Sequence, residues 1–125
     1  MFSIIIPTFN NLEYLKLCLN SIEKNSNFLH EIILHINDGS DGTLKYAKES
    51  KLKFTHSTDN LGLCSAINLA AKLSTTNYIL YAHDDMYFCP KWDDYLIKEI
   101  NFIKHENFYL SGTMIEPNSG HIKLD

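Results

Sequence analysis

The chain has 125 residues, of which 45% are hydrophobic and 21% charged, and its net charge is −4. This length and composition are ordinary for a single globular domain, residues 1–125, that can bury a core. Without a basic run there is no electrostatic support for binding to nucleic acid or to anionic membranes. No apolar stretch approaches the ~20 residues of a membrane span.

Two features of the composition bear on function. All eleven basic residues are lysines, so helix N-termini, lysines or a metal would have to neutralise a bound diphosphate in place of a guanidinium group. The three cysteines are far apart and form no CxxC pair. We therefore expect reduced thiols and a cytoplasmic protein.

The first quarter of the chain predicts a strand and a helix. Residues 2–6 are apolar and β-branched, which is typical of a buried parallel strand, and Pro7 is expected to end it. Asn10 or Asn11 can cap the helix that follows. Its apolar stripe, with i, i+3 and i+4 spacing, spans residues 12–22.

The middle of the chain repeats this alternation. Residues 31–36 are the second predicted strand, and Asp41 can cap a second helix. Residues 53–57 are a short third strand. A third helix, rich in small residues, covers 63–73, and residues 78–82 form the fourth strand.

The last third predicts one more helix and one more strand. Pro90 suits the first position of a helix, Trp92 is expected in the core, and Asp93 suits the positive end of the helix dipole. Residues 108–115 have the pattern of another strand. The whole order predicts an α/β fold with a mostly parallel open sheet and helices on both faces, Rossmann-like in layout.

Two acid-rich turns follow predicted strands. Asp38 follows the second strand, and the pair Asp84 and Asp85 follows the fourth. Ligands of open α/β sheets bind outside the carboxyl ends of the strands. Adjacent carboxylates at such a place repel each other and lose solvation, and a bound Mg²⁺ or Mn²⁺ would relieve both costs. The turns predict a site for a divalent metal and a polar ligand such as a sugar nucleotide.

Each motif alone also has an ordinary structural explanation. An Asp-Asp pair is common in solvated turns, and the segment after Asp38 can be an Asx-turn that leads into a helix. The loop after Pro7 can be a plain strand stop, and Asn60 and Gly62 can serve only to shape a turn. The coincidence of two acidic turns at matching strand ends favours a ligand site.

Four segments, in order and at normal spacing, resemble the family 2 glycosyltransferases of the GT-A fold. They are residues 3–10, 37–43, 60–68 and 83–92. The resemblance implies transfer of a sugar from a nucleotide-diphosphate donor to an acceptor hydroxyl, usually with inversion, assisted by Mn²⁺ or Mg²⁺. A UDP-sugar is the favoured donor, and the acceptor, whether glycan, lipid or protein, is left open.

The resemblance also implies roles for individual residues. Asp85 matches the metal-ligating acid, and Asp84 should lie near the metal or the ribose. His83 stands where the family's acidic motif begins with an aspartate, which leaves metal binding mainly to Asp85. The implied substrate-binding residues are Pro7, Thr8, Phe9, Asn10, Asp38, Gly39, Asn60, Gly62 and Asp84.

Three readings of the function remain at this point. Family members place the acceptor site and the catalytic base beyond the length of this chain, so we expect a truncated GT-A domain. We name no general base, since Glu116 is the only late acid besides the terminal Asp125. The first reading is a glycosyltransferase donor domain, and the second is a nucleotide-sugar-binding module without turnover. The third is a receiver-like Mg²⁺ domain, which the absence of a lysine near Glu116 disfavours. If the acceptor half is cut away, apolar surface on the last predicted helix and strand would lie open, and we would then expect self-association.

Overall fold

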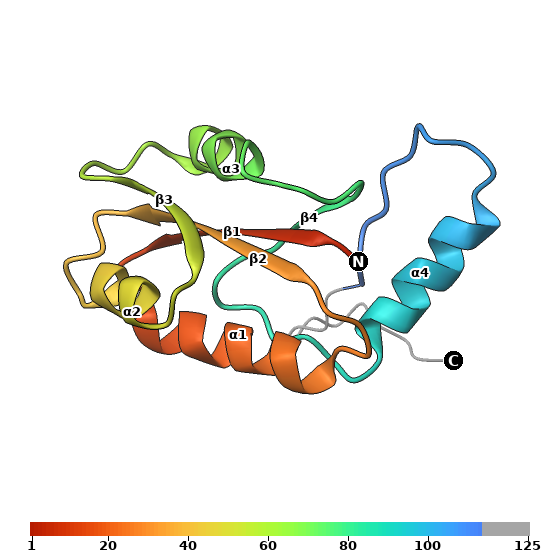
Figure 1. The fold of residues 1–125 in the computed structure, drawn as a ribbon, viewed down its shortest axis with the longest axis horizontal. Helices are drawn as coiled ribbons and strands as arrows, with labels where there is room; N and C mark the ends of the chain where they lie inside the picture. The colour runs from red at the N-terminus through yellow and green to blue at the C-terminus, as the bar shows by residue number, and fades with distance from the viewer. Residues whose placement is uncertain (114–125) are drawn as a thin grey trace, which may run out of the picture.

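The computed structural model describes residues 1–113. Strands and helices alternate along this part of the chain, and the expected layout is confirmed (Figure 1). The elements, in order, are β1 (Ser3–Phe9), α1 (Leu12–Asn25), β2 (Glu31–Asn37), α2 (Thr43–Glu49), β3 (Lys53–Ser57), α3 (Leu63–Ala71), β4 (Ile79–Tyr81) and α4 (Trp92–Phe102).

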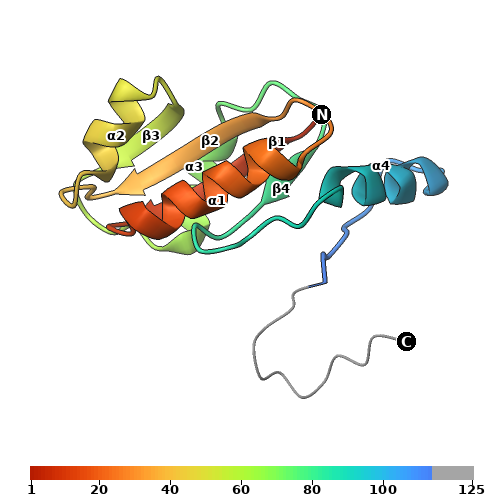
Figure 2. The same cartoon turned by 90° about the horizontal axis from the view of Figure 1, so that it is seen from below.

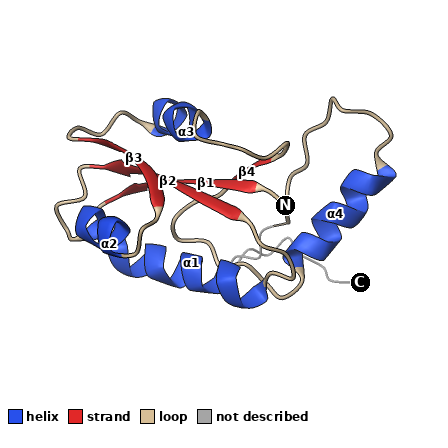
Figure 3. Cartoon of the chain, viewed as in Figure 1, coloured by secondary structure: helices blue, strands red, loops and turns tan. Residues whose placement is uncertain are grey.

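The strands form one parallel sheet in the order β3-β2-β1-β4. Helices α1 and α2 lie on one face and α3 on the other, as Figures 1 and 2 show. The loops that follow β2 and β3 project from the same end of the sheet (Figure 3). None of the helices within residues 1–113 is long and apolar enough to cross a membrane.

Pro7 does not end β1, which contradicts the prediction. The strand continues to Phe9, with Pro7 paired to His35 of β2. Pairing of β1 with β4 stops at Ile5, whose carbonyl accepts a hydrogen bond from Ala82 N. In a parallel strand the N–H groups alternate between neighbours, so the N–H that Pro7 lacks would face the β4 side, where pairing has ended. The proline therefore removes no hydrogen bond of the sheet.

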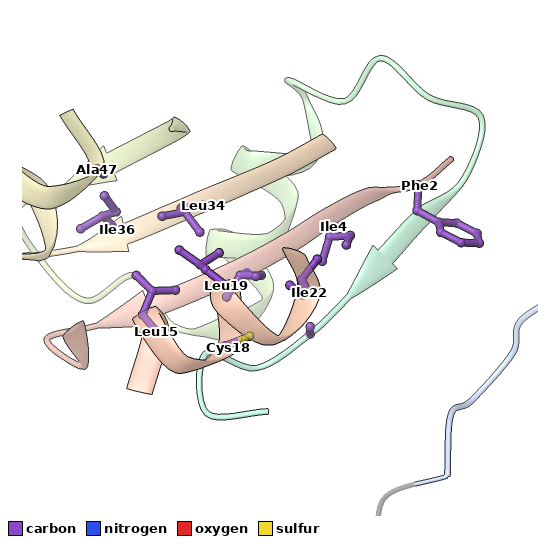
Figure 4. Close-up of a cluster of buried hydrophobic side chains, with 11 residues drawn as sticks. Phe2, Ile4, Leu15, Cys18, Leu19, Ile22, Leu34, Ile36 and Ala47 are labelled. Carbon is purple, nitrogen blue, oxygen red and sulfur yellow. The ribbon is translucent and has the colours of Figure 1, made fainter. Parts of the chain in front are cut away.

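Two hydrophobic layers hold the sheet. The larger one joins β1 and β2 to α1, and Figure 4 shows Ile4, Leu15, Cys18, Leu19 and Leu34 within it. The smaller one, on the opposite face, contains Ile5, Ile33 and Ala70 of α3. The small side chain of Ala70 is fully buried there.

The end of the described chain corrects two expectations. Helix α4 begins at Trp92, because Lys91 has a left-handed backbone (φ 64°) and donates its N–H to Asn25 O; Pro90 therefore precedes the helix. Trp92 packs against the larger core, as expected. Residues 108–113 form no strand, and the remaining two residues of the predicted strand, like Glu116, lie outside the described part.

Candidate functional site

A cleft lies at the carboxyl end of β1. The sheet order places β2 on one side of β1 and β4 on the other, so the direction of winding reverses between β1 and β4. Such reversal points are where open α/β sheets bind ligands. The cleft has a volume of about 360 Å³ and is lined by the β1–α1 turn, the end of β2, the turn before α3 and the turn after β4.

Most of the predicted site residues line this cleft. They are Pro7, Thr8, Phe9, Asn10, Asn60, Gly62 and Asp84. Asp38, Gly39 and Asp85 are not among its lining residues but adjoin residues that are. The lining residues that were not predicted are Asn11, Asn37, Leu63 and His83. Ligand contact stays a prediction for all of them.

Asn10 ties the β1–α1 turn to Asp38. Its amide donates to Asp38 Oδ2 at 2.8 Å and accepts from Gly39 N at 2.9 Å. Hydrogen bonds from Asn10 and Ser40 lower the pKa of the exposed Asp38 carboxyl, which keeps it ionised. Gly39 has φ +81°, and a Cβ there would lie 2.7 Å from Ile36 Cγ2, so this turn requires glycine.

Asn37 joins three walls of the cleft. It is 4% exposed, its Oδ1 accepts from Leu61 N at 2.9 Å, and its Nδ2 donates to Thr8 O at 3.4 Å. Thr8 is also buried, and its hydroxyl has no hydrogen-bond partner among residues 1–113. A buried hydroxyl without a partner is unfavourable, so Thr8 is a costly polar group in the cleft wall.

Asn11 connects the same turn to the acidic loop. Its Nδ2 donates to Asp84 Oδ1 at 3.1 Å, across 73 positions of sequence. Neither Asn10 nor Asn11 caps α1, contrary to the prediction, because both side chains reach other loops. Asp41 supplies the cap: its Oδ2 accepts from Leu12 N at 3.0 Å and its Oδ1 from Thr43 N at 3.0 Å, so one carboxylate serves two helix starts.

The negative charges of Asp84 and Asp85 raise the pKa values of nearby groups. Burial, and then Asp84 and Asp85, raises the pKa of the Cys18 thiol to about 12. Burial and the same two carboxylates also raise the pKa of the Tyr81 phenol. Neither aspartate forms an ion pair with any residue that the structure describes.

These carboxylates suit a hard divalent cation. Oxygen donors are those that Mg²⁺ and Mn²⁺ prefer, and a cation would relieve the negative potential. No group of three or more His, Cys, Asp or Glu side chains within residues 1–113 is arranged to enclose an ion. The donor set therefore fits an ion held by one or two carboxylates together with phosphate oxygens of a ligand.

Comparison with known proteins identifies the family. The model of glycosyl transferase family 2 matches residues 3–125. The chain belongs to this family. Among curated relatives, an uncharacterized glycosyltransferase of Rickettsia bellii is 34% identical over 119 residues, which are 89% of this chain and 16% of that protein. One of Mycoplasma genitalium is 32% identical over 116 residues, 85% of this chain and 37% of that protein.

Solved structures support the GT-A fold of this family 2 chain. S. aureus TarS 1-349 in complex with UDP has a TM-score of 0.72 and 25% identity, covering 81% of this chain and 32% of that one. The same protein in complex with UDP-GlcNAc has a TM-score of 0.64 and 26% identity, covering 81% and 30%. The chain thus spans about a third or less of the TarS chains.

A buried polar network supports the cleft of this family 2 chain from below. His35 is fully buried on the α3 face of the sheet, with Nδ1 2.7 Å from Thr55 Oγ1 and Nε2 3.2 Å from Ser57 Oγ. Ser57 Oγ in turn lies 3.3 Å from Asn37 Oδ1 in the cleft wall. Burial lowers the pKa of His35, so the folded chain holds this imidazole neutral.

We expect His35 to make folding stability depend on pH. Below its unfolded pKa of about 6.5, the unfolded chain takes up a proton that the folded chain does not, so stability falls as the pH drops. The slope from this group is at most about 1.4 kcal/mol per pH unit. Urea unfolding between pH 5 and 8 of the wild type and of His35→Gln measures it. The variant should have the shallower slope, and equal slopes would contradict the assignment.

Proposed function

We propose that this chain is the donor-nucleotide-binding part of a glycosyltransferase that transfers a sugar from a nucleoside diphosphate to an acceptor hydroxyl, with metal assistance and inversion. The observation that carries the proposal is the cleft at the β1/β4 reversal point, which two acidic turns flank. The likeness to TarS structures with bound UDP and UDP-GlcNAc supports a uridine nucleotide as the first ligand to test.

The proposed site has a nucleoside half and a diphosphate half. In the nucleoside half, Pro7, Thr8 and Phe9 line the base pocket, and Asp38 accepts hydrogen bonds from the base or ribose. Asp38 suits this role because Asn10 and Ser40 hold its carboxylate ionised and in one orientation. Phe9 is 51% exposed, so its ring is available for a planar base.

In the diphosphate half, Asp85, helped by Asp84, would hold a Mn²⁺ or Mg²⁺ ion. When bound, such an ion neutralises the diphosphate and acts as a Lewis acid on the leaving group. No lysine within residues 1–113 lines the cleft and the sequence has no arginine, so the described part of the chain brings little positive charge of its own to the phosphates. The reduced thiols and a cytoplasmic location expected from the sequence belong to the same proposal.

Titration calorimetry with UDP, in Mn²⁺ and in EDTA, tests the proposal. We expect micromolar binding in Mn²⁺, much weaker binding in EDTA, and little affinity for ADP at the same concentrations. Absence of UDP and GDP binding under every condition would refute a nucleotide site. If UDP binds, hydrolysis or transfer of sugar from UDP-GlcNAc distinguishes an active donor domain from a module that binds without turnover.

A further inference from the structure

Helix α1 carries a row of polar side chains that face the loop after β4. Asn11, Cys18 and Asn25 are seven residues apart, so they lie on one side of the helix, and Ser21 lies beside them. The loop between β4 and α4 runs along this side of α1 (Figure 2). We call these four residues the α1 polar seam.

Each member of the seam makes a hydrogen bond to the loop. Asn11 donates to Asp84 Oδ1 at 3.1 Å, and Cys18 Sγ donates to His83 O at 3.6 Å. Further along the helix, Ser21 Oγ accepts from Phe88 N at 2.9 Å, and Asn25 Nδ2 donates to Phe88 O at 2.6 Å. Regular pairing of β4 with the sheet ends at Tyr81, so the seam holds the acidic loop where the sheet no longer does.

Asn11 is the member of the seam that touches a carboxylate. It stands at the N-cap position of α1 but makes no capping bond, and Asp41 provides the cap instead. Its amide is thereby available to Asp84, whose carboxylate makes no other hydrogen bond with the described residues. The adjacent Asn10 holds Asp38, so two consecutive asparagines bond two of the three acids of the site.

We propose that Asn11 is a positioning residue that orients Asp84 for the metal and diphosphate half of the donor site. This inference rests on the proposed function. The bond holds Asp84 in one rotamer before the ligand binds. The entropic cost of ordering this side chain therefore does not reduce the free energy of binding. Asn11 acts through Asp84, so its effect should appear only in the part of nucleotide affinity that depends on the metal.

The test compares UDP affinity in Mn²⁺ and in EDTA for the wild type, Asn11→Ala and Asn20→Ala. Asn20 is an exposed asparagine of the same helix whose side chain makes no hydrogen bond with residues 1–113, and it serves as the matched control. We expect Asn11→Ala to bind UDP about tenfold more weakly in Mn²⁺, the size expected for ordering one side chain, with unchanged affinity in EDTA. Asn20→Ala should match the wild type in both conditions.

A double-mutant cycle with Asp84→Ala provides the second measurement. If Asn11 acts through Asp84, adding Asn11→Ala to Asp84→Ala should cause no further loss. Equal losses in Mn²⁺ and EDTA, or additive losses in the cycle, would mean that Asn11 contacts the nucleotide itself and would overturn the inference. Wild-type affinity in Asn11→Ala would overturn it too, while leaving the proposed function intact. A wild type that binds no UDP would overturn both.

Discussion

Replacing Asp93 with alanine is expected to destabilise the fold by about 3–5 kcal/mol, because it leaves the buried His30 imidazole and two backbone N–H groups without their acceptor. Asp93 is fully buried, and its Oδ2 accepts hydrogen bonds from Asn27 N at 2.8 Å, Phe28 N at 2.9 Å and His30 Nε2 at 3.0 Å. Burial alone would raise the pKa of this carboxyl, but the bonds from His30, Phe28 and Asn27 lower it.

This carboxylate fastens α4 to the turn between α1 and β2. His30 also accepts from Phe2 N at 3.2 Å and stacks on the Phe2 ring, with centroids 5.2 Å apart. Asp93 thus closes a network that joins α4 to the start of β1. The loss of several kcal/mol is a large fraction of the stability of a domain of this size.

Thermal unfolding followed by circular dichroism measures the effect of Asp93→Ala. We expect Tm to fall by roughly 10–20 °C. Asp94→Ala is the matched control in the same helical turn. Within residues 1–113 the Asp94 carboxylate bonds only to the exposed side chain of Asn27, so the Tm of this variant should change by a few degrees at most. Equal, small changes in both variants would show that Asp93 does not hold α4 in place.

Replacing Asp85 with alanine is expected to remove the dependence of UDP binding on Mn²⁺. Asp85 is exposed beside Asp84, and we assign it the main ligation of the metal. A metal ion stabilises bound phosphate charge by several kcal/mol. The affinity of Asp85→Ala for UDP in Mn²⁺ should therefore be on the order of 100-fold lower than that of the wild type. Affinity in EDTA should stay at the wild-type value, because the nucleoside half of the cleft is unchanged.

Asp85→Asn is the conservative companion to this variant. The amide keeps the shape of the side chain but loses the charge that holds a hard cation. We expect calorimetry to give the same loss for Asp85→Asn as for Asp85→Ala. If either variant bound UDP in Mn²⁺ as tightly as the wild type, this carboxylate would not bind the metal, and Asp84 would be the remaining candidate ligand.

Periodic patterns predicted most of the fold. The apolar run at 31–36 became β2 because buried parallel strands need continuous apolar segments. Residues 53–57 alternate only weakly between apolar and polar side chains, and they form β3, the partly exposed edge strand beside β2. Pro7 misled the prediction because its effect depends on where β4 ends, which local sequence does not reveal. The expected strand at 108–115 has an adequate local pattern, but residues 108–113 pair with no strand of the described sheet.

The acids that follow strands could be predicted from the sequence. The asparagine side chains that bond residues far away in the sequence could not. The pattern placed Asp84 at the end of β4, beside the cleft. Asparagine is common in caps and turns, so the sequence does not mark Asn11 or Asn37 as a link between distant segments. The Asn11 amide bonds the loop after β4, 73 positions away, and the Asn37 amide bonds Thr8 of the neighbouring strand β1, 29 positions away. Asp93 suited a helix dipole, and only the fold reveals that His30 and two backbone N–H groups meet it.

A crystal structure of the chain with UDP and Mn²⁺ tests the proposed site as a whole. We predict that the nucleotide occupies the cleft between β1 and β4, with the base beside Phe9 and Asp38 and the metal bridging Asp85 and the diphosphate. UDP bound elsewhere on the fold, or a metal bound away from Asp84 and Asp85, would refute this site.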